Sequence, residues 1–104
     1  MRKIESQMFN ALSSRTPVKL GNTEVKHVRD TYVGLRLCSV FDVYLHGNHI
    51  AYVLVDEYGR LRHSGANYDT FRNWPTATTR SRLRALGINA SIKNHQACID
   101  GQVI

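Results

Sequence analysis

The chain has 104 residues, of which 42% are hydrophobic and 21% are charged, so its composition fits one small globular domain and excludes a disordered chain. Lys and Arg total 14 against 8 Asp and Glu, which gives a formal net charge of +6. This charge favours polyanionic partners such as nucleic acid, an acidic protein or an anionic membrane surface.

The N-terminal segment predicts an amphipathic helix over residues 3–14, because Ile4, Met8 and Leu12 recur every four residues. Pro17 prevents a continuation of the helix. After a turn at Gly21-Asn22, a strand is expected over Thr23–Val28. The next stretch, RDTYVGLRL, is interrupted by a glycine and is expected to be a loop that could contain an extra strand.

The segment SVFDVYLHGNHIAYVLVDEYG predicts a β-hairpin with Gly47-Asn48 as its two-residue turn. This turn sets His46 opposite His49 and places an apolar set of side chains on one face. That set is Phe41, Val43, Leu45, Ile50, Tyr52 and Leu54. The other face is expected to carry Asp42, Tyr44, His46, His49, Ala51 and Val53.

The remaining elements follow from turn signals and caps. Gly59 suits a turn before a strand over residues 60–64, and an irregular segment with three aromatic anchors follows. Thr78 or Thr79 is expected to cap a second helix that runs to Leu86 and stops at Gly87. A final hairpin turns at residues 100–101, with arms over residues 93–99 and 102–104.

Together these elements predict one α+β domain over residues 1–104. Its antiparallel sheet of about five strands consists of the central meander plus the C-terminal hairpin, with two short helices. The N-terminal stretch is too polar for a signal peptide, and no run reaches the ~20 apolar residues of a membrane span. Cys38 and Cys98 lie in apolar stretches and are expected to be buried thiols, with a bridge between them as the alternative.

The stretch VYLHGNHIAYV, the aromatic-rich loop after it and the pattern W-x-T-x-T-T-x-S-R-L-x-A-L-G resemble a family of small proteins encoded by tailed bacteriophages. The N-terminal RKIESQMFNAL is similar as well, so the resemblance spans most of the chain. Its most specific pieces are YLHGN at residues 44–48 and TTRSRL at residues 78–83. The resemblance implies a phage origin and a place in the host bacterial cytoplasm, and it implies no particular chemistry.

The arginines near the start of the second helix are the main candidate site. Cations at a helix N-terminus oppose the helix dipole, and a bound anion would relieve that conflict. Free backbone N–H groups, hydroxyls and guanidinium groups together suit a phosphate. Including arginines earlier in the chain, the predicted anion-binding residues are Thr79, Arg80, Ser81, Arg82, Arg84, Arg60, Arg62 and Arg72. The alternative is a solvated basic face paired with Asp69 or Glu57.

Aromatic residues lie close to these arginines in the sequence. Tyr68, Phe71 and Trp74 could stack on bases while the arginines follow the phosphates, which is how single strands are bound. The alternative is that the three rings anchor a long loop to the core.

The histidines at the tip of the predicted hairpin give little support to metal binding or catalysis. A metal site needs three or four ligands, and His46 with His49 supplies two. A nuclease that uses Asp42, His46 and His49 is a minor alternative, since no catalytic motif is present. We therefore expect no enzyme activity, no metal and no cofactor.

The sequence predicts a non-enzymatic phage accessory protein that binds a polyanion, nucleic acid first, through the arginine-rich helix start. The alternative is an inhibitor or modulator of a host transcription, replication or defence protein. Its contact surface would be the exposed hairpin face of Tyr44, His46, His49 and Val53, or an acidic host protein could use the same arginines. A membrane is not expected as a partner.

Overall fold

The computed structural model describes residues 2–104. Within that range the helices are α1 (Lys3–Ser13), α2 (Tyr68–Asn73) and α3 (Ala77–Ala85). The strands are β1 (Val18–Leu20), β2 (Thr23–Val33), β3 (Arg36–Leu45), β4 (Asn48–Asp56), β5 (Leu61–Ala66), β6 (Ala90–Lys93), β7 (Gln96–Ile99) and β8 (Gln102–Val103).

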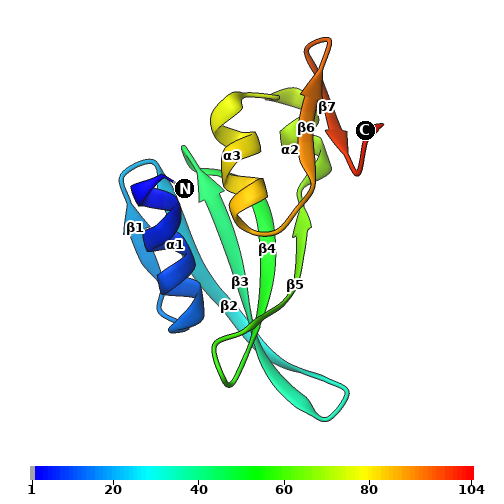
Figure 1. Cartoon of the computed structure of the whole chain (residues 1–104). Helices are drawn as coiled ribbons and strands as arrows, with labels where there is room; N and C mark the ends of the chain where they lie inside the picture. Colours follow the sequence, from blue (N-terminus) through cyan, green and yellow to red (C-terminus); the bar gives the residue numbers. More distant parts are fainter. Residues whose placement is uncertain (1) are drawn as a thin grey trace.

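The strands form two antiparallel sheets, a five-stranded meander in the order β1-β2-β3-β4-β5 and a three-stranded sheet in the order β6-β7-β8. Helix α1 packs on β1 and β2, while α3 packs on β4 and β6 and lies beside α1 in front of the large sheet (Figure 1). The core lies between these layers, and all three helices contribute to it through Leu12, Phe71 and Leu83. The predicted α+β class with a sheet of about five strands is confirmed.

Two details of this architecture differ from the sequence prediction. The meander supplies all five strands of the large sheet, and the C-terminal hairpin belongs to the second sheet. The segment expected to be irregular contains α2. Asn67 caps the N-terminus of this helix, because its side chain accepts a hydrogen bond from the Thr70 N–H at 3.2 Å. The helix buries Phe71. The N-cap and the burial of Phe71 together stabilise a six-residue helix here.

Strands β2 and β3 form a long arm where the sequence predicted a loop. They pair from Thr23↔Leu45 to Val33↔Arg36, so the glycine that interrupts the apolar pattern is the turn residue, with a φ of 64° at Gly34. The arm projects past the end of β4, as the lower right of Figure 1 shows. At its tip Leu35 is fully exposed.

The β3–β4 hairpin forms, but its predicted register is wrong. The turn is His46-Gly47, with φ values of 51° and 78°, and Tyr44 rather than His46 faces His49. The His46 N–H donates to the Asn22 carbonyl at 2.7 Å, which helps to hold the turn at this position, one residue earlier than predicted. Ile50 is then an extra, bulged residue between the pairs Tyr44↔His49 and Val43↔Ala51.

The bulge changes which side chains of β4 face the core. Ile50 still points inward beside Leu45, as predicted, but beyond the bulge the alternation is reversed. Val53 is therefore fully buried, whereas Tyr52 and Leu54 are half-buried on the opposite face. The predicted placement of Tyr52 and Leu54 in the core, and of Ala51 and Val53 on the exposed face, is wrong for this reason.

A buried carboxylate organises the turn between β4 and β5. Asp56 has no exposed surface and accepts hydrogen bonds from the N–H groups of Tyr58 at 2.9 Å and Arg60 at 3.0 Å. Burial raises the pKa of Asp56, but these N–H groups and the charges of Arg36 and Arg62 outweigh burial and lower the pKa below its ordinary value.

The C-terminal sheet contains one more turn than predicted. The turn at Asp100-Gly101 joins β7 to β8 as expected. The predicted arm over residues 93–99 is divided by a turn at Asn94-His95, where both φ values are positive, and this turn joins β6 to β7. Both cysteines of the chain, Cys38 and Cys98, are buried free thiols.

None of the helices in residues 2–104 is long and apolar enough to cross a membrane.

Candidate functional site

Helix α3 starts earlier than the sequence indicated. Its N-cap is Thr76, whose side chain accepts a hydrogen bond from the Thr79 N–H at 3.1 Å, and the helix begins at Ala77. Arg82 and Arg84 therefore lie in the last turn, where the helix dipole favours positive charge. The predicted conflict between the arginines and the dipole is wrong, and it gives no reason to expect an anion.

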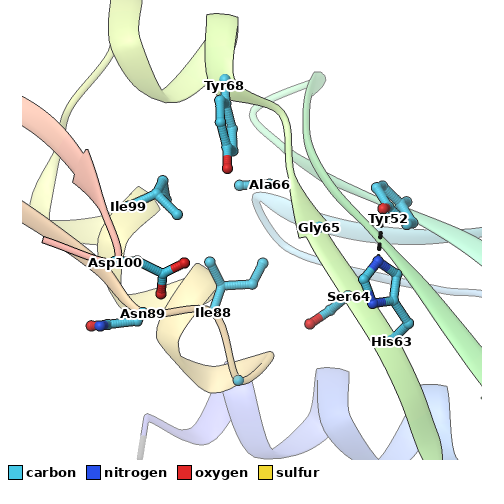
Figure 2. A pocket seen from close by; sticks show the side chains of 11 residues that line it. Tyr52, His63, Ser64, Gly65, Ala66, Tyr68, Ile88, Asn89, Ile99 and Asp100 are labelled. Carbon is cyan, nitrogen blue, oxygen red and sulfur yellow. Dashed lines mark hydrogen bonds between the residues drawn. The ribbon is translucent and has the colours of Figure 1, made fainter. Parts of the chain in front are cut away.

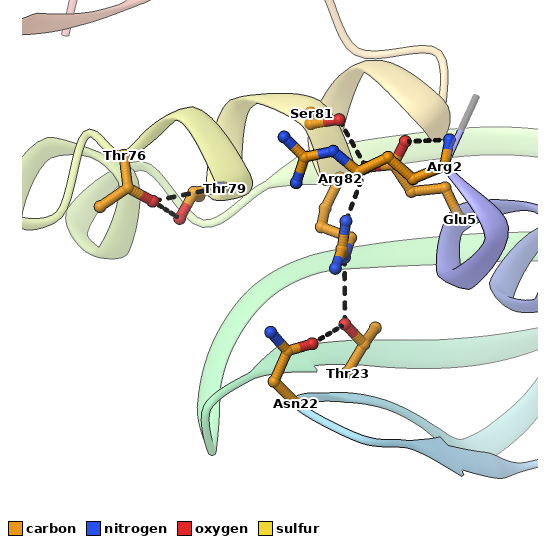
Figure 3. Close-up of polar contacts among 8 residues, drawn as sticks. All are labelled: Arg2, Glu5, Asn22, Thr23, Thr76, Thr79, Ser81 and Arg82. Carbon is orange, nitrogen blue, oxygen red and sulfur yellow. Dashed lines mark hydrogen bonds and ion pairs between the residues drawn. The ribbon is translucent and has the colours of Figure 1, made fainter.

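One of the predicted anion ligands is part of the core. Arg82 is buried, and its Nη1 lies 2.7 Å from Oε2 of Glu5 on α1, while its Nε donates to Oγ1 of Thr23 at 3.0 Å. Ser81 donates to the same Glu5 oxygen at 2.5 Å. Figure 3 shows these contacts joining α3 to α1 and to the start of β2. The partner of Arg82 is thus Glu5, and not Asp69 or Glu57.

The charge of Glu5 is stabilised by this arrangement. Burial raises the pKa of its carboxyl group, but hydrogen bonds from Ser81 and Arg82 and from the Arg2 N–H, together with the Arg82 charge, outweigh burial and lower the pKa below its ordinary value. A paired and hydrogen-bonded carboxylate of this kind holds two helices in register. The Thr79 hydroxyl, another predicted ligand, is buried and shares a hydrogen bond with Thr76 at 2.9 Å.

The remaining arginines of α3 line a basic cleft. This cleft, of about 580 Å³, lies between α3, the start of α1 and the end of β6. Its basic side chains are Arg2, Arg80, Arg84 and Lys93. The acid in its lining is Glu5, whose charge is already matched by Arg82 from within. The cleft therefore presents an excess of positive charge to solvent.

The cleft joins residues that are far apart in the sequence. Arg84 is oriented by a hydrogen bond from its Nη1 to the Ala90 carbonyl at 3.0 Å, at the start of β6. Arg2 and Lys93 were not among the predicted site residues, because they come from opposite ends of the chain. Their only sequence signal is the positive charge itself, and the fold is needed to bring them beside Arg80.

The other predicted arginines lie elsewhere. Arg60 and Arg62 are at the β4–β5 turn, at the opposite end of the large sheet from the start of α3 (Figure 1). There Nη1 of Arg62 lies 3.9 Å from Oδ2 of Asp56. Arg72 is on α2 and forms an exposed ion pair with Asp69 at 2.7 Å. The predicted arginines are thus divided between the core and three places on the surface, and of the predicted residues only Arg80, Ser81 and Arg84 line the cleft.

The aromatic residues of the same region also separate. Phe71 is buried in the core, as the anchoring alternative expected, whereas Trp74 is 55% exposed. Trp74 lines a pocket of about 240 Å³ that Leu45 and Ile50 also line, together with the hydroxyl-bearing residues Thr70, Thr76 and Thr78. This pocket and the basic cleft adjoin the same first turn of α3.

Tyr68 faces a different hollow, of about 570 Å³, between the edge of β5 and the second sheet. Figure 2 shows the Asp100 carboxylate directed into this hollow, across from the Tyr68 hydroxyl, with Ile88 and Ile99 on its wall. On its other side Tyr52 and His63 are joined by a hydrogen bond of 3.0 Å. Lys and Arg are absent from its lining, so this hollow does not suit a polyanion.

The predicted hairpin surface is only partly exposed. His46 is exposed in the turn, Tyr44 and His49 are half-buried, and Val53 is in the core. The His49 ring lies between Asp42, at 3.1 Å from its Nε2, and Asn67, at 3.0 Å from its Nδ1. Among residues 2–104 no group of three or more His, Cys, Asp or Glu side chains is arranged to hold a metal ion.

Comparison with known proteins identifies the family. The model of the Kyanoviridae Gp96 protein family matches residues 1–103, and the chain belongs to this family of bacteriophage proteins. The predicted phage resemblance is confirmed. No curated protein and no solved structure matches the chain.

Proposed function

We propose that this phage protein is a non-enzymatic binder of polyanions, and of nucleic acid in particular, that acts in the host bacterial cytoplasm through its basic cleft. The observation that carries the proposal is the convergence of Arg2, Arg80, Arg84 and Lys93 on one cleft of about 580 Å³. The net charge of +6 adds a long-range attraction to any polyanion. Basic side chains that converge in a concave surface suit a phosphate backbone better than the same charges scattered over a flat one.

The chemistry of the proposal is that of phosphate contacts. The guanidinium groups can donate paired hydrogen bonds to phosphate oxygens, and Lys93 supplies a point charge. Contacts of this kind give affinity and position without base specificity. Arg82 has no direct part in binding, since it is buried against Glu5. Its role is to hold α3 against α1 and so to fix one wall of the cleft.

The test is a fluorescence-anisotropy titration of a labelled oligonucleotide at several salt concentrations. The variant Arg80→Gln with Arg84→Gln should bind more weakly, and its slope of log affinity against log salt should fall by roughly one unit per lost phosphate contact. The matched control is Arg29→Gln with Arg60→Gln, which removes the same charge at exposed arginines on β2 and at the β4–β5 turn, away from the cleft. If both double variants weaken binding equally, net charge alone acts and the cleft is not the site.

A second candidate function, binding of a host protein, is favoured by a different surface. The tip of the β2–β3 arm exposes Tyr32, Val33 and Leu35, and exposed apolar patches mark protein contacts. Because Val53 is buried, the hairpin face is the weaker surface for this role. Binding to a host protein would be lost in Leu35→Asp and would depend little on salt. Binding of nucleic acid in the cleft would be retained in Leu35→Asp and would weaken steeply as salt is added.

A further inference from the structure

We propose that the nucleic acid bound in the cleft is single-stranded and that one unpaired base stacks on Trp74. This inference rests on the proposed function, and it adds a second contact on the other side of the first turn of α3. The phosphates would lie in the basic cleft, and the base would enter the pocket of about 240 Å³ beside the tryptophan.

Trp74 is placed for such a contact, and its position has little structural explanation. Its side chain is 55% exposed, although a tryptophan normally buries most of its large apolar surface. The aromatic pairs found among residues 2–104 do not include it. Its backbone is fixed between α2 and α3, since the Trp74 N–H donates to the Thr70 carbonyl at 2.9 Å. The backbone at Trp74 is therefore held in position, and more than half of the residue's surface is free to contact another ring.

The pocket has the composition of a site for one flat, partly polar group. Leu45 and Ile50 supply apolar contact, and threonines with His46 and Asn48 supply hydrogen-bonding groups. Its volume of about 240 Å³ is below the range typical of sites for drug-sized ligands, which is roughly 300–1,000 Å³. A single base is small enough for this volume and suits this lining, because it offers an apolar stacking face and a polar edge.

The pocket and the cleft are close enough for one short strand. Ala77 lines the cleft and the next residue, Thr78, lines the pocket. The two hollows therefore lie on either side of the first turn of one helix, which is about 10 Å across. Single strands are bound elsewhere by this combination of a basic groove and an aromatic ring over a few nucleotides. The positive cleft next to the pocket is what favours a nucleotide base over an uncharged aromatic ligand.

The single-stranded state follows from the shape of the pocket. It is a half-open hollow bordered by α2, by the start of α3 and by the β3–β4 turn, so a base that enters it has to leave its stack. A base in a duplex would have to break its pairing and stacking first, at a cost that a single strand does not have. The remaining exposed ring of this region, Tyr68, faces a hollow that also holds the Asp100 carboxylate, which disfavours a phosphate backbone.

Trp74 is the one tryptophan of the chain, so its fluorescence reports on this pocket directly. The experiment titrates the full-length protein with single-stranded DNA, single-stranded RNA and duplex DNA of the same sequence. Tryptophan emission and the anisotropy of labelled oligonucleotides are recorded in parallel. We expect the single strands to quench the emission and to bind more tightly than the duplex, and DNA and RNA to differ little because the pocket contacts the base.

Variants separate stacking from structure. Trp74→Leu should lower single-strand affinity about tenfold, as for the loss of one base–aromatic stack, and should leave duplex affinity unchanged. Trp74→Phe should recover part of that loss, because it restores a ring. Tyr58→Leu is the matched control, since Tyr58 is a similarly exposed ring far from the cleft, and it should bind as the parent does.

The outcomes distinguish this inference from the proposed function. If Trp74→Leu binds single strands as tightly as the parent while Arg80→Gln with Arg84→Gln binds weakly, the stacking inference is wrong and the cleft proposal stands. Equal affinity for single strands and duplex also overturns the inference. If no oligonucleotide binds even at low salt, both proposals fail.

Discussion

Arg80 and Arg82 stand two residues apart on the same helix and have opposite surroundings. Arg82 is buried and paired with Glu5, whereas Arg80 lines an open cleft with other cations around it. The difference arises because α1 crosses α3 on one side only, so the side chain that points toward α1 becomes part of the core. Residue type and spacing are thus poor guides to whether an arginine stabilises the fold or is available to a ligand.

The largest effect should come from breaking the buried pair. Arg82→Ala leaves the Glu5 carboxylate buried without its ionic partner, which should reduce the free energy of unfolding by about 3–5 kcal/mol. Arg80→Ala makes the same chemical change in the same helix and should reduce the free energy of unfolding by no more than about 0.5 kcal/mol. Urea unfolding followed by circular dichroism measures both. Equal losses in the two variants would mean that the ion pair does not hold α1 against α3.

A second comparison concerns neighbouring residues of β4. Val53 is fully buried and Leu54 is half-buried on the opposite face. Val53→Ala should therefore reduce the free energy of unfolding by about 2 kcal/mol, from the transfer of two methyl groups and the cavity left behind. Leu54→Ala should cost less, although it removes more atoms. A larger loss for Leu54→Ala would support the register that the sequence predicted, without the bulge at Ile50.

The start of α3 offers a smaller test. Thr76→Ala removes the side-chain oxygen that accepts the Thr79 N–H and should reduce the free energy of unfolding by about 1 kcal/mol. Thr78→Ala is the matched control and should be close to neutral, because Thr78 lies inside the helix. Thermal unfolding measures both variants. A larger loss of stability for Thr78→Ala than for Thr76→Ala would mean that Thr78 caps the helix, as the sequence indicated.

These comparisons indicate which features the sequence could predict. Local patterns identified α1, the β3–β4 hairpin and the turn at residues 100–101, because each depends on spacing within a few residues. The β3–β4 register was missed because Gly47 fits either of two adjacent turns, and the contact of His46 with Asn22, which favours the observed one, is distant in sequence. The long arm was missed because one glycine can interrupt a strand or form its turn.

The candidate site was predicted less well than the fold, for a related reason. Arg80 and Arg84 were found from their charge and spacing, but Arg2 and Lys93 join them only through the packing of α1 and β6 on α3. The burial of Arg82 depends on Glu5, which is 77 residues away along the chain. A local pattern contains neither fact. Exposure is a property of the assembled layers, and it decides which charged residues face a ligand.

Lowering the pH gives the smallest and most selective test of the contrast between Arg80 and Arg82. Acid weakens the buried pair of Arg82 with Glu5 without changing either arginine. The pKa of Glu5 lies below its ordinary value of 4.5 in the folded protein, so the charged carboxylate stabilises the fold at pH values above about 4.5. That contribution is lost as the pH falls through 4.5 toward the lower folded pKa. Protonation leaves the hydrogen-bonding atoms in place, so the loss should be smaller than that caused by Arg82→Ala.

The measurement is the free energy of unfolding from about pH 7 down to about pH 3, for the parent and for Glu5→Gln with Arg82→Met. The double variant removes both charges and leaves no buried ion unpaired. Asp56, whose pKa is also lowered, contributes to the acid sensitivity of both proteins, so the difference between the two curves isolates Glu5. The parent should lose more stability than the double variant below about pH 4.5. Parallel curves would mean that the charged form of the Glu5 carboxyl group gains nothing from its surroundings in the folded protein.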